Sequence, residues 1–185
     1  MPDKIVPRYI ESLKNPRIPG FSWPEAEDSD DLEIFRKILE KGAQTFTNDA
    51  RDGKNAHSYT VGLYLNFLHP EIVILGLSND LAVEGFSKIR NEADSGKTIN
   101  TGDERVDLFR LRQPVKFISI SDDISKIDYL DHAAWFYRSL FFFQEPTLTH
   151  KFPVLQAVWA DQHGYYPGDP RCEERVRLLQ KIQAP

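Results

Sequence analysis

Two widely separated parts of the sequence carry side chains that could perform acid–base chemistry. His57 opens a segment of alternating residues, and Asp161 and His163 stand close together near the C-terminus. Imidazole and carboxylate groups can transfer protons when they lie within hydrogen-bond reach of a substrate. If the fold gathers His57, Asp161 and His163 at one mouth of a sheet, the chain would be a small-molecule hydrolase.

A second imidazole and carboxylate pair lies in the short segment Leu68-His69-Pro70-Glu71. His69 and Glu71 could also perform acid–base catalysis at the tip of a hairpin. The simpler interpretation is that both side chains satisfy backbone groups of the turn and restrain its register. We favour this structural role.

Small and aromatic residues mark a candidate ligand site. Ser58, Thr60 and Gly62 leave one face of their segment almost bare, which could accept either a ligand or a closely packed helix. Gln156 falls among apolar residues, where its amide needs partners, either in a core hydrogen-bond network or in a recognition site. Tyr and Trp combine contact area with a polar group. The candidate ligand-binding residues are therefore Thr60, Gly62, Gln156, Trp159, Tyr165 and Tyr166.

The pattern of metal-binding and nucleophilic residues predicts neither a metal nor a cofactor. The five histidines show no close spacing of the kind that binds zinc. The single cysteine, Cys172, falls on the apolar stripe of a predicted helix, which favours a buried and unreactive thiol. The chain also has no nucleophile elbow, phosphate-binding glycine loop or dinucleotide fingerprint.

Composition indicates a globular protein of one domain. The chain has 185 residues, of which 41% are hydrophobic and 28% charged, and its net charge is −5. This charge disfavours nucleic acid as a partner, although it leaves room for a local basic patch. One cysteine, no signal-like N-terminus and no long apolar run predict a cytoplasmic protein without a membrane partner.

Proline content and periodicity divide the chain into an N-terminal arm and a folded domain. Residues 1–28 form the proline-rich arm, and residues 29–185 form a single α+β domain. The predicted helices cover residues 30–41, a segment from Asn79 to Gly96, residues 127–143 and residues 171–183. The predicted strands cover residues 43–48, 57–65, 72–75, 106–112, 115–121 and 152–160. We therefore expect a mainly antiparallel sheet covered by about four helices.

The longest predicted helix, residues 127–143, has two apolar faces. One face should pack on the sheet, and the other carries His132, Phe136 and Phe143. This second face is too aromatic to stand freely in water, so the arm, another chain or a ligand should cover it. It is a candidate interaction face for a homodimer or a protein partner.

Two stretches of sequence resemble the bacterial domain-of-unknown-function family 4262. The first runs from His57-Ser58-Tyr59-Thr60-Val61-Gly62-Leu63 to His69-Pro70-Glu71, and the second from Gln156-Ala157-Val158-Trp159-Ala160-Asp161 to Tyr166-Pro167. The resemblance covers roughly residues 42–170 and leaves the arm outside. Ala160 stands where the family usually has proline, and Gly168 where an aromatic residue is common. The family implies no established activity.

Two functional hypotheses therefore remain from the sequence. The first is a protein- or ligand-interaction module without catalysis, suggested by the aromatic helix face, the arm and the lack of a recognised catalytic motif. The alternative is a small-molecule hydrolase with a His/Asp site. We prefer the interaction module because it requires no convergence of distant residues.

Overall fold

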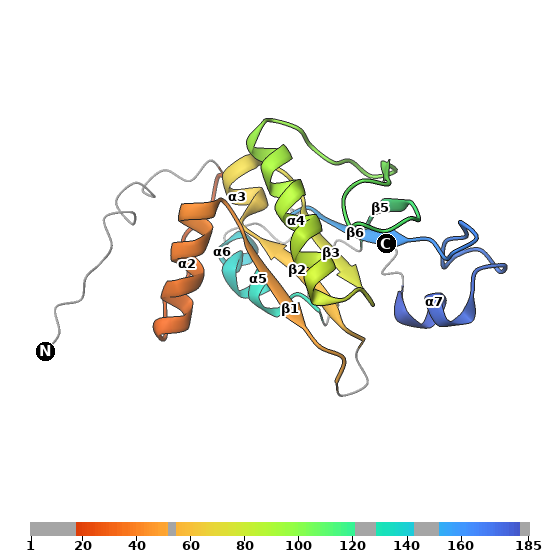
Figure 1. Ribbon diagram of the computed structural model, residues 1–185. Coiled ribbons are helices and arrows are strands. Elements are labelled where there is room, and N and C mark those ends of the chain that lie inside the picture. Colours follow the sequence, from red (N-terminus) through yellow and green to blue (C-terminus); the bar gives the residue numbers. More distant parts are fainter. Residues whose placement is uncertain (1–17, 52–54, 121–128, 143–151, 182–185) are drawn as a thin grey trace, which may run out of the picture.

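The protein is built around one six-stranded sheet with helices on both faces (Figure 1). The computed structural model describes residues 18–51, 55–120, 129–142 and 152–181. The strand order is β1-β2-β3-β6-β5-β4. The strands are β1 (Gln44–Asn48), β2 (His57–Val61), β3 (Glu71–Leu75), β4 (Glu104–Arg105), β5 (Val115–Ser119) and β6 (Val154–Trp159).

The α+β class is confirmed, but the sheet is mixed rather than mainly antiparallel. Its central pair, β3 and β6, runs parallel, with Ile72 opposite Leu155. The expected hairpin of β2 and β3 is antiparallel, with His57 opposite Leu75. Both central strands are buried along nearly their whole length, as strands covered by helices on two faces should be.

The first described helix, α2 (Ser29–Lys41), has clear start and stop signals. The Asp28 side chain accepts hydrogen bonds from the backbone N–H groups of Asp30 and Asp31 and so caps the start of the helix. Gly42 ends the helix in a left-handed conformation, with φ of 84°. This reversal leads directly into β1 and places the end of α2 beside the sheet.

The predicted strand over residues 57–65 is half strand and half helix. β2 ends at Val61, and Gly62, with φ of 109°, turns the chain into the short helix α3 (Leu63–Phe67). A side chain at Gly62 would be strained at this φ and would also meet Ile38 and the Gly42 carbonyl. The bare face of β2 therefore does not continue past Thr60.

One face of the sheet is covered by α4 (Asn79–Asp94). Ala82, Phe86 and Ile89 of this helix pack on Ile72 and Ile74 of β3. The prediction of a strand over residues 106–112 is wrong, because this segment is irregular and Arg110 has a left-handed φ of 48°. Instead, Leu108 and Phe109 are buried in the same cluster as α4.

The other face is covered by α5 (Asp131–Phe136) and α6 (Ser139–Phe142), where one long helix was predicted. Phe136 is 0% exposed and contacts Phe21, Trp23 and Phe35 of the same chain. The described end of the arm therefore covers this part of the proposed interaction face. His132 is exposed, and Phe143 and arm residues 1–17 lie outside the described residues.

The last described helix is α7 (Glu174–Leu179), which is shorter than the predicted helix over residues 171–183. Cys172, just before this helix, is 3% exposed, and burial raises the pKa of its thiol. None of the described helices is long and apolar enough to cross a bilayer.

Candidate functional site

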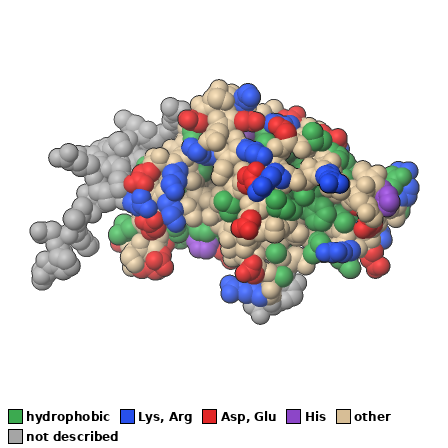
Figure 2. All heavy atoms as spheres, in the orientation of Figure 1, with side chains coloured by type: hydrophobic (Ala, Val, Ile, Leu, Met, Phe, Trp, Pro, Cys, Tyr) green, Lys and Arg blue, Asp and Glu red, His purple; other side chains and the backbone are tan. Residues whose placement is uncertain are grey.

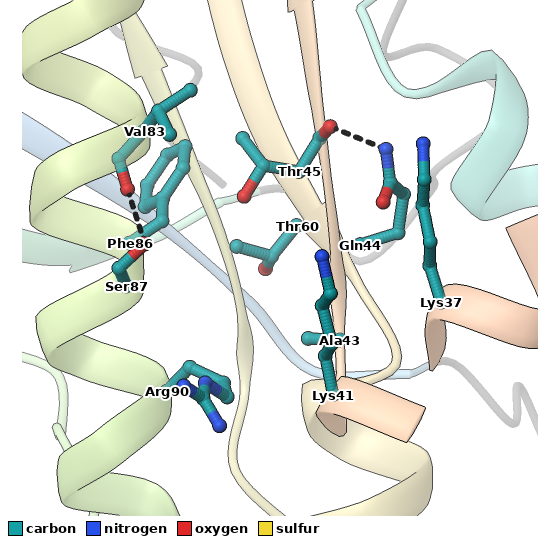
Figure 3. A pocket seen from close by; sticks show the side chains of 10 residues that line it. All are labelled: Lys37, Lys41, Ala43, Gln44, Thr45, Thr60, Val83, Phe86, Ser87 and Arg90. Atoms are coloured by element: carbon teal, nitrogen blue, oxygen red, sulfur yellow. Dashed lines mark hydrogen bonds between the residues drawn. The ribbon is translucent and has the colours of Figure 1, made fainter. Parts of the chain in front are cut away.

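A pocket of about 290 Å³ opens between α2, β1 and α4 (Figure 3). Its lining side chains come from α2, β1, β2 and α4, and from Ala43 between α2 and β1. The pocket is lined by cationic, hydroxyl-bearing and apolar residues: Lys37, Lys41, Ala43, Gln44, Thr45, Thr60, Val83, Phe86, Ser87 and Arg90.

Three cations border this pocket. Lys37 and Lys41 come from the last two turns of α2, and Arg90 comes from the second half of α4. Lys37 Nζ lies 3.8 Å from Glu33 Oε1. Within the part of the chain that the structure describes, Lys41 and Arg90 form no ion pair. Two positive charges at the pocket therefore have no carboxylate within ion-pair distance among the described residues, although Lys41 still interacts with Glu33 at longer range.

The cations are local to the pocket rather than part of a broad basic surface. Lys and Arg side chains are interspersed with Asp and Glu side chains over the visible face (Figure 2). Lys88, for example, pairs with Glu84 on the same helix as Arg90. This mixed surface suits a small anion better than an extended polyanion.

Thr60 connects the pocket to a buried carboxylate. Thr60 lines the pocket, is 1% exposed and donates from Oγ1 to Glu71 Oε2 at 2.7 Å. The same Oγ1 accepts a hydrogen bond from the Ile72 backbone N–H at 2.9 Å. The hydroxyl thus joins β2, β3 and the pocket wall.

Glu71 is fully buried and is surrounded by hydrogen-bond donors. Its Oε1 accepts from the backbone N–H groups of Gly62 and Tyr64 and from the Tyr137 hydroxyl, at 2.8, 3.0 and 2.6 Å. Burial raises the pKa of Glu71, and the hydrogen bonds from Thr60, Tyr137, Tyr64 and Gly62 oppose this rise. Burial and the neighbouring Glu71 also raise the pKa of Tyr137 well above its ordinary value.

His69 is a structural residue of the same turn. Its Nε2 accepts from the Ile99 backbone N–H at 3.1 Å, and its Nδ1 lies 2.6 Å from the Pro70 carbonyl. Ile99 can only donate, so the ring is neutral with its proton on Nδ1. Burial lowers the pKa of His69 accordingly. His69 therefore bonds one backbone group of the predicted turn, the Pro70 carbonyl, and one outside it, whereas the backbone partners of Glu71, Gly62 and Tyr64, precede the turn.

A comparison with protein families matches residues 37–173, about three quarters of the chain, to DUF4262, a domain of unknown function. The chain belongs to the DUF4262 family. All of the pocket-lining residues and the Glu71 network fall within the DUF4262 match. Searches of curated proteins and of solved structures returned no match.

The three candidate hydrolase residues lie in two places within the DUF4262 region: His57 on β2, and Asp161 and His163 in the loop after β6. His57 starts β2, where its ring meets Tyr129 edge-on, with centroids 4.9 Å apart. Asp161 accepts backbone N–H bonds from His163, Tyr165 and Glu173, so it organises its own loop. His163 has a side chain that is 61% exposed, and its Nε2 lies 3.9 Å from Glu173 Oε1. The hydrolase site stays a prediction.

The candidate ligand-binding residues do not form one group in the structure. Thr60 lines the pocket, whereas Gly62 supports the Glu71 network. Gln156 is 0% exposed and donates to the Lys181 carbonyl, and Trp159 donates from Nε1 to the Leu75 carbonyl. These two bonds fit the expected core network. In the late loop, Arg171 lies over the Tyr165 ring at 4.2 Å, and burial raises the pKa of Tyr166.

Sequence reasoning missed the cations of the pocket. Lysines near the end of a helix are common because they interact favourably with the helix dipole, so Lys37 and Lys41 carried no special signal. Arg90 borders the same pocket because α4 packs across β1 and β2. Among the described residues, no group of three or more His, Cys, Asp or Glu side chains could hold a metal ion.

Proposed function

We propose that this protein is a ligand-binding module that holds a small anionic molecule in the pocket between α2, β1 and α4. The observation that carries the proposal is the convergence of Lys41 and Arg90 on the pocket without a described carboxylate partner. The whole chain has a charge of −5, so such a cluster is not a by-product of a basic composition.

The lining residues supply the groups that bind an anion. A guanidinium can hold two oxygens of a carboxylate, sulfate or phosphate at once, and lysine adds a flexible point charge. The hydroxyl of Thr45 provides a further donor, whereas the Ser87 hydroxyl already donates to the Val83 carbonyl at 2.8 Å. The apolar side chains of Val83 and Phe86 would contact an organic part of the ligand.

The size and chemistry of the pocket favour binding of a small molecule without turnover. A volume of about 290 Å³ lies near the lower end of typical ligand sites, which excludes large cofactors. The lining contains no histidine, cysteine, aspartate or glutamate. This set of side chains is suited to holding a charge and offers no imidazole or carboxylate for moving a proton.

Sulfate binding tests the proposal, because sulfate is a compact dianion. We expect sulfate, measured by calorimetry at constant ionic strength, to bind the wild type and to bind Lys41→Met and Arg90→Met about tenfold more weakly each. Lys97→Met and Arg175→Met remove the same charges from exposed positions and should bind like the wild type. Equal sulfate affinity in all five proteins, or no binding at all, would overturn the proposal.

We also propose a cytoplasmic location, which the single cysteine supports.

A homodimer through the helix face of His132, Phe136 and Phe143 receives less support, because Phe136 is already covered by its own chain. His132 itself stacks on Phe46, with ring centroids 4.2 Å apart, and its Nδ1 lies 2.8 Å from the Tyr59 hydroxyl.

A further inference from the structure

Glu71 can accept a proton at only one of its two oxygens. Oε1 already receives three donors, from Gly62, Tyr64 and Tyr137. The Tyr137 hydroxyl accepts from the Leu65 N–H and shares the single Gly62 N–H with Oε1, so its own hydrogen points at Glu71. A proton that joins the carboxylate therefore binds to Oε2.

Oε2 has one described partner, the hydroxyl of Thr60 at 2.7 Å. When Glu71 is ionised, Thr60 donates to it. When Oε2 carries the proton, the bond must reverse, because two hydrogens cannot share one short contact. Thr60 Oγ1 then accepts from Glu71 as well as from Ile72 N–H, and the Thr60 hydrogen has to find another acceptor.

The pocket is where that acceptor can be placed. Thr60 forms part of the pocket wall, and its side chain lies in the space between β1 and α4 (Figure 3). An anion held by Lys41 and Arg90 has oxygens that accept hydrogen bonds. Such an anion would accept from the freed hydroxyl in a charge-assisted hydrogen bond, which is stronger than a bond to a neutral acceptor.

We propose that the pocket binds its anion together with one proton. Glu71 takes up this proton, and the Thr60 hydroxyl then donates its own hydrogen to the anion. The proton comes from solvent, the O–H bond forms at Oε2, and no bond of the anion changes. This inference rests on the proposed anion-binding function and adds its regulation: affinity increases as pH falls.

Electrostatics act in the same direction as the hydrogen bonds. A buried carboxylate next to the pocket repels an anion, and a neutral carboxylic acid does not. Burial already raises the pKa of Glu71, which brings its protonation closer to neutral pH. On the side of Glu71 that faces the pocket, the charged groups are Lys37, Lys41 and Arg90. On the side of Glu71 away from the pocket, the titratable group is Tyr137.

Calorimetry with sulfate tests this inference, because sulfate does not change protonation near neutral pH. We expect wild-type affinity to rise as pH falls, by at most about tenfold per pH unit. Repeating the titration in buffers of different ionisation enthalpy should reveal uptake of up to one proton per sulfate. This second readout uses the wild type alone and does not depend on a variant that folds.

Glu71→Gln is the matched variant. Its amide nitrogen can donate to Thr60 Oγ1 and its carbonyl can accept the three remaining donors, so it mimics the protonated acid. We expect it to bind sulfate with little pH dependence and no proton uptake, as tightly as the wild type binds at low pH. Thr60→Val should weaken binding and reduce the pH dependence to the part that repulsion by the Glu71 carboxylate causes, and Thr60→Ser should restore the wild-type affinity and pH dependence.

The outcomes separate this inference from the proposed function. Sulfate binding that depends on Lys41 and Arg90 but takes up no proton, with Glu71→Gln matching the wild type at every pH, would overturn the proton coupling alone. No sulfate binding by the wild type at any pH would overturn the anion pocket and the coupling together.

Discussion

Two buried titratable residues, His69 and Glu71, lie two positions apart and respond to pH in opposite senses. Burial lowers the pKa of His69, so the folded protein keeps this ring neutral. Burial raises the pKa of Glu71, so the folded protein favours its protonated form more than the unfolded chain does. A fall in pH therefore lowers the free energy of unfolding through His69 and raises it through Glu71.

For His69, we expect the free energy of unfolding to fall as pH drops through about 6.5. Below this pH His69 binds a proton in the unfolded chain but not in the folded protein. The free energy of unfolding therefore falls by up to about 1.4 kcal/mol per pH unit. The slope should be smaller in His69→Leu, although that variant is less stable throughout because the Ile99 N–H loses its acceptor. Urea unfolding between about pH 5 and 8 measures it.

A variant that changes no titratable group provides the control for this prediction. Leu32→Ala, at a position that is 42% exposed, should keep the wild-type slope. A His69→Leu protein with the same pH slope as the wild type would contradict the assignment of a neutral buried ring.

The residue patterns revealed local roles but not distant partners. Structural rather than catalytic roles for His69 and Glu71 could be predicted, because the bonds of these side chains to Pro70 and Tyr64 lie close in sequence. The Tyr137 hydroxyl that completes the Glu71 network is 66 positions away. Nothing in the periodicity around Tyr137 distinguishes it from an ordinary apolar position of a helix.

At the scale of elements, α4 depends on a glycine in its second turn. A β-carbon on Gly85 would come within 2.0 Å of Phe109 Cδ1, because the Phe109 ring packs directly against the helix backbone. This close approach explains why a residue with low helix propensity occupies the middle of a helix. Phe109 also packs edge-on against Phe86, with centroids 5.8 Å apart.

Gly85→Ala should therefore destabilise the protein, although this change normally stabilises a helix by about 1 kcal/mol. We expect a loss of about 1–3 kcal/mol from overpacking, measured by denaturant unfolding. Asn91→Ala, at an exposed position of the same helix, should instead be neutral or slightly stabilising. A more stable Gly85→Ala protein would show that Phe109 does not pack on this helix.

Elements were predicted well where local signals dominate and poorly where backbone geometry intervenes. The helix ending at Lys41, β1, β3 and α4 follow from periodicity, caps and apolar runs. Alternating apolar residues continue past Val61, yet the positive φ of Gly62 turns the strand into α3. Residues 106–112 alternate like a strand but bury Leu108 and Phe109 without pairing.

At the scale of the whole molecule, the arm stabilises the face of the sheet that it covers. Phe21 is 5% exposed and contacts Phe136 and Tyr137, with ring centroids 5.4 and 5.9 Å away. Next to it, the Ser22 backbone N–H donates to Ser139 Oγ at 2.8 Å. The end of the arm is thus part of the folded core.

We expect Phe21→Ala to lower the free energy of unfolding by about 3 kcal/mol, because it opens a cavity among aromatic rings. Leu32→Ala, at a position that is 42% exposed, should change it by less than about 0.5 kcal/mol. Thermal unfolding midpoints should not depend on protein concentration, because docking occurs within one chain. A midpoint that rises with concentration would favour docking between two chains.

The pocket belongs to this scale, which is why the sequence did not reveal it. Its cations come from α2 and α4, its floor from β1 and β2, and no single segment carries the set. Thr60 was a candidate because of its place on a bare strand face. The cations that line the pocket with Thr60 could be identified only from the positions of α2 and α4 in the structure.

The parallel pair at the centre of the sheet has a consequence for how the protein is made. β3 ends at Leu75, and its neighbour β6 begins at Val154. During synthesis the hairpin of β2 and β3 therefore emerges long before the strand that closes its open edge. Such long-range pairing is slow, so we expect the nascent chain to present an unpaired apolar strand edge that chaperones can bind.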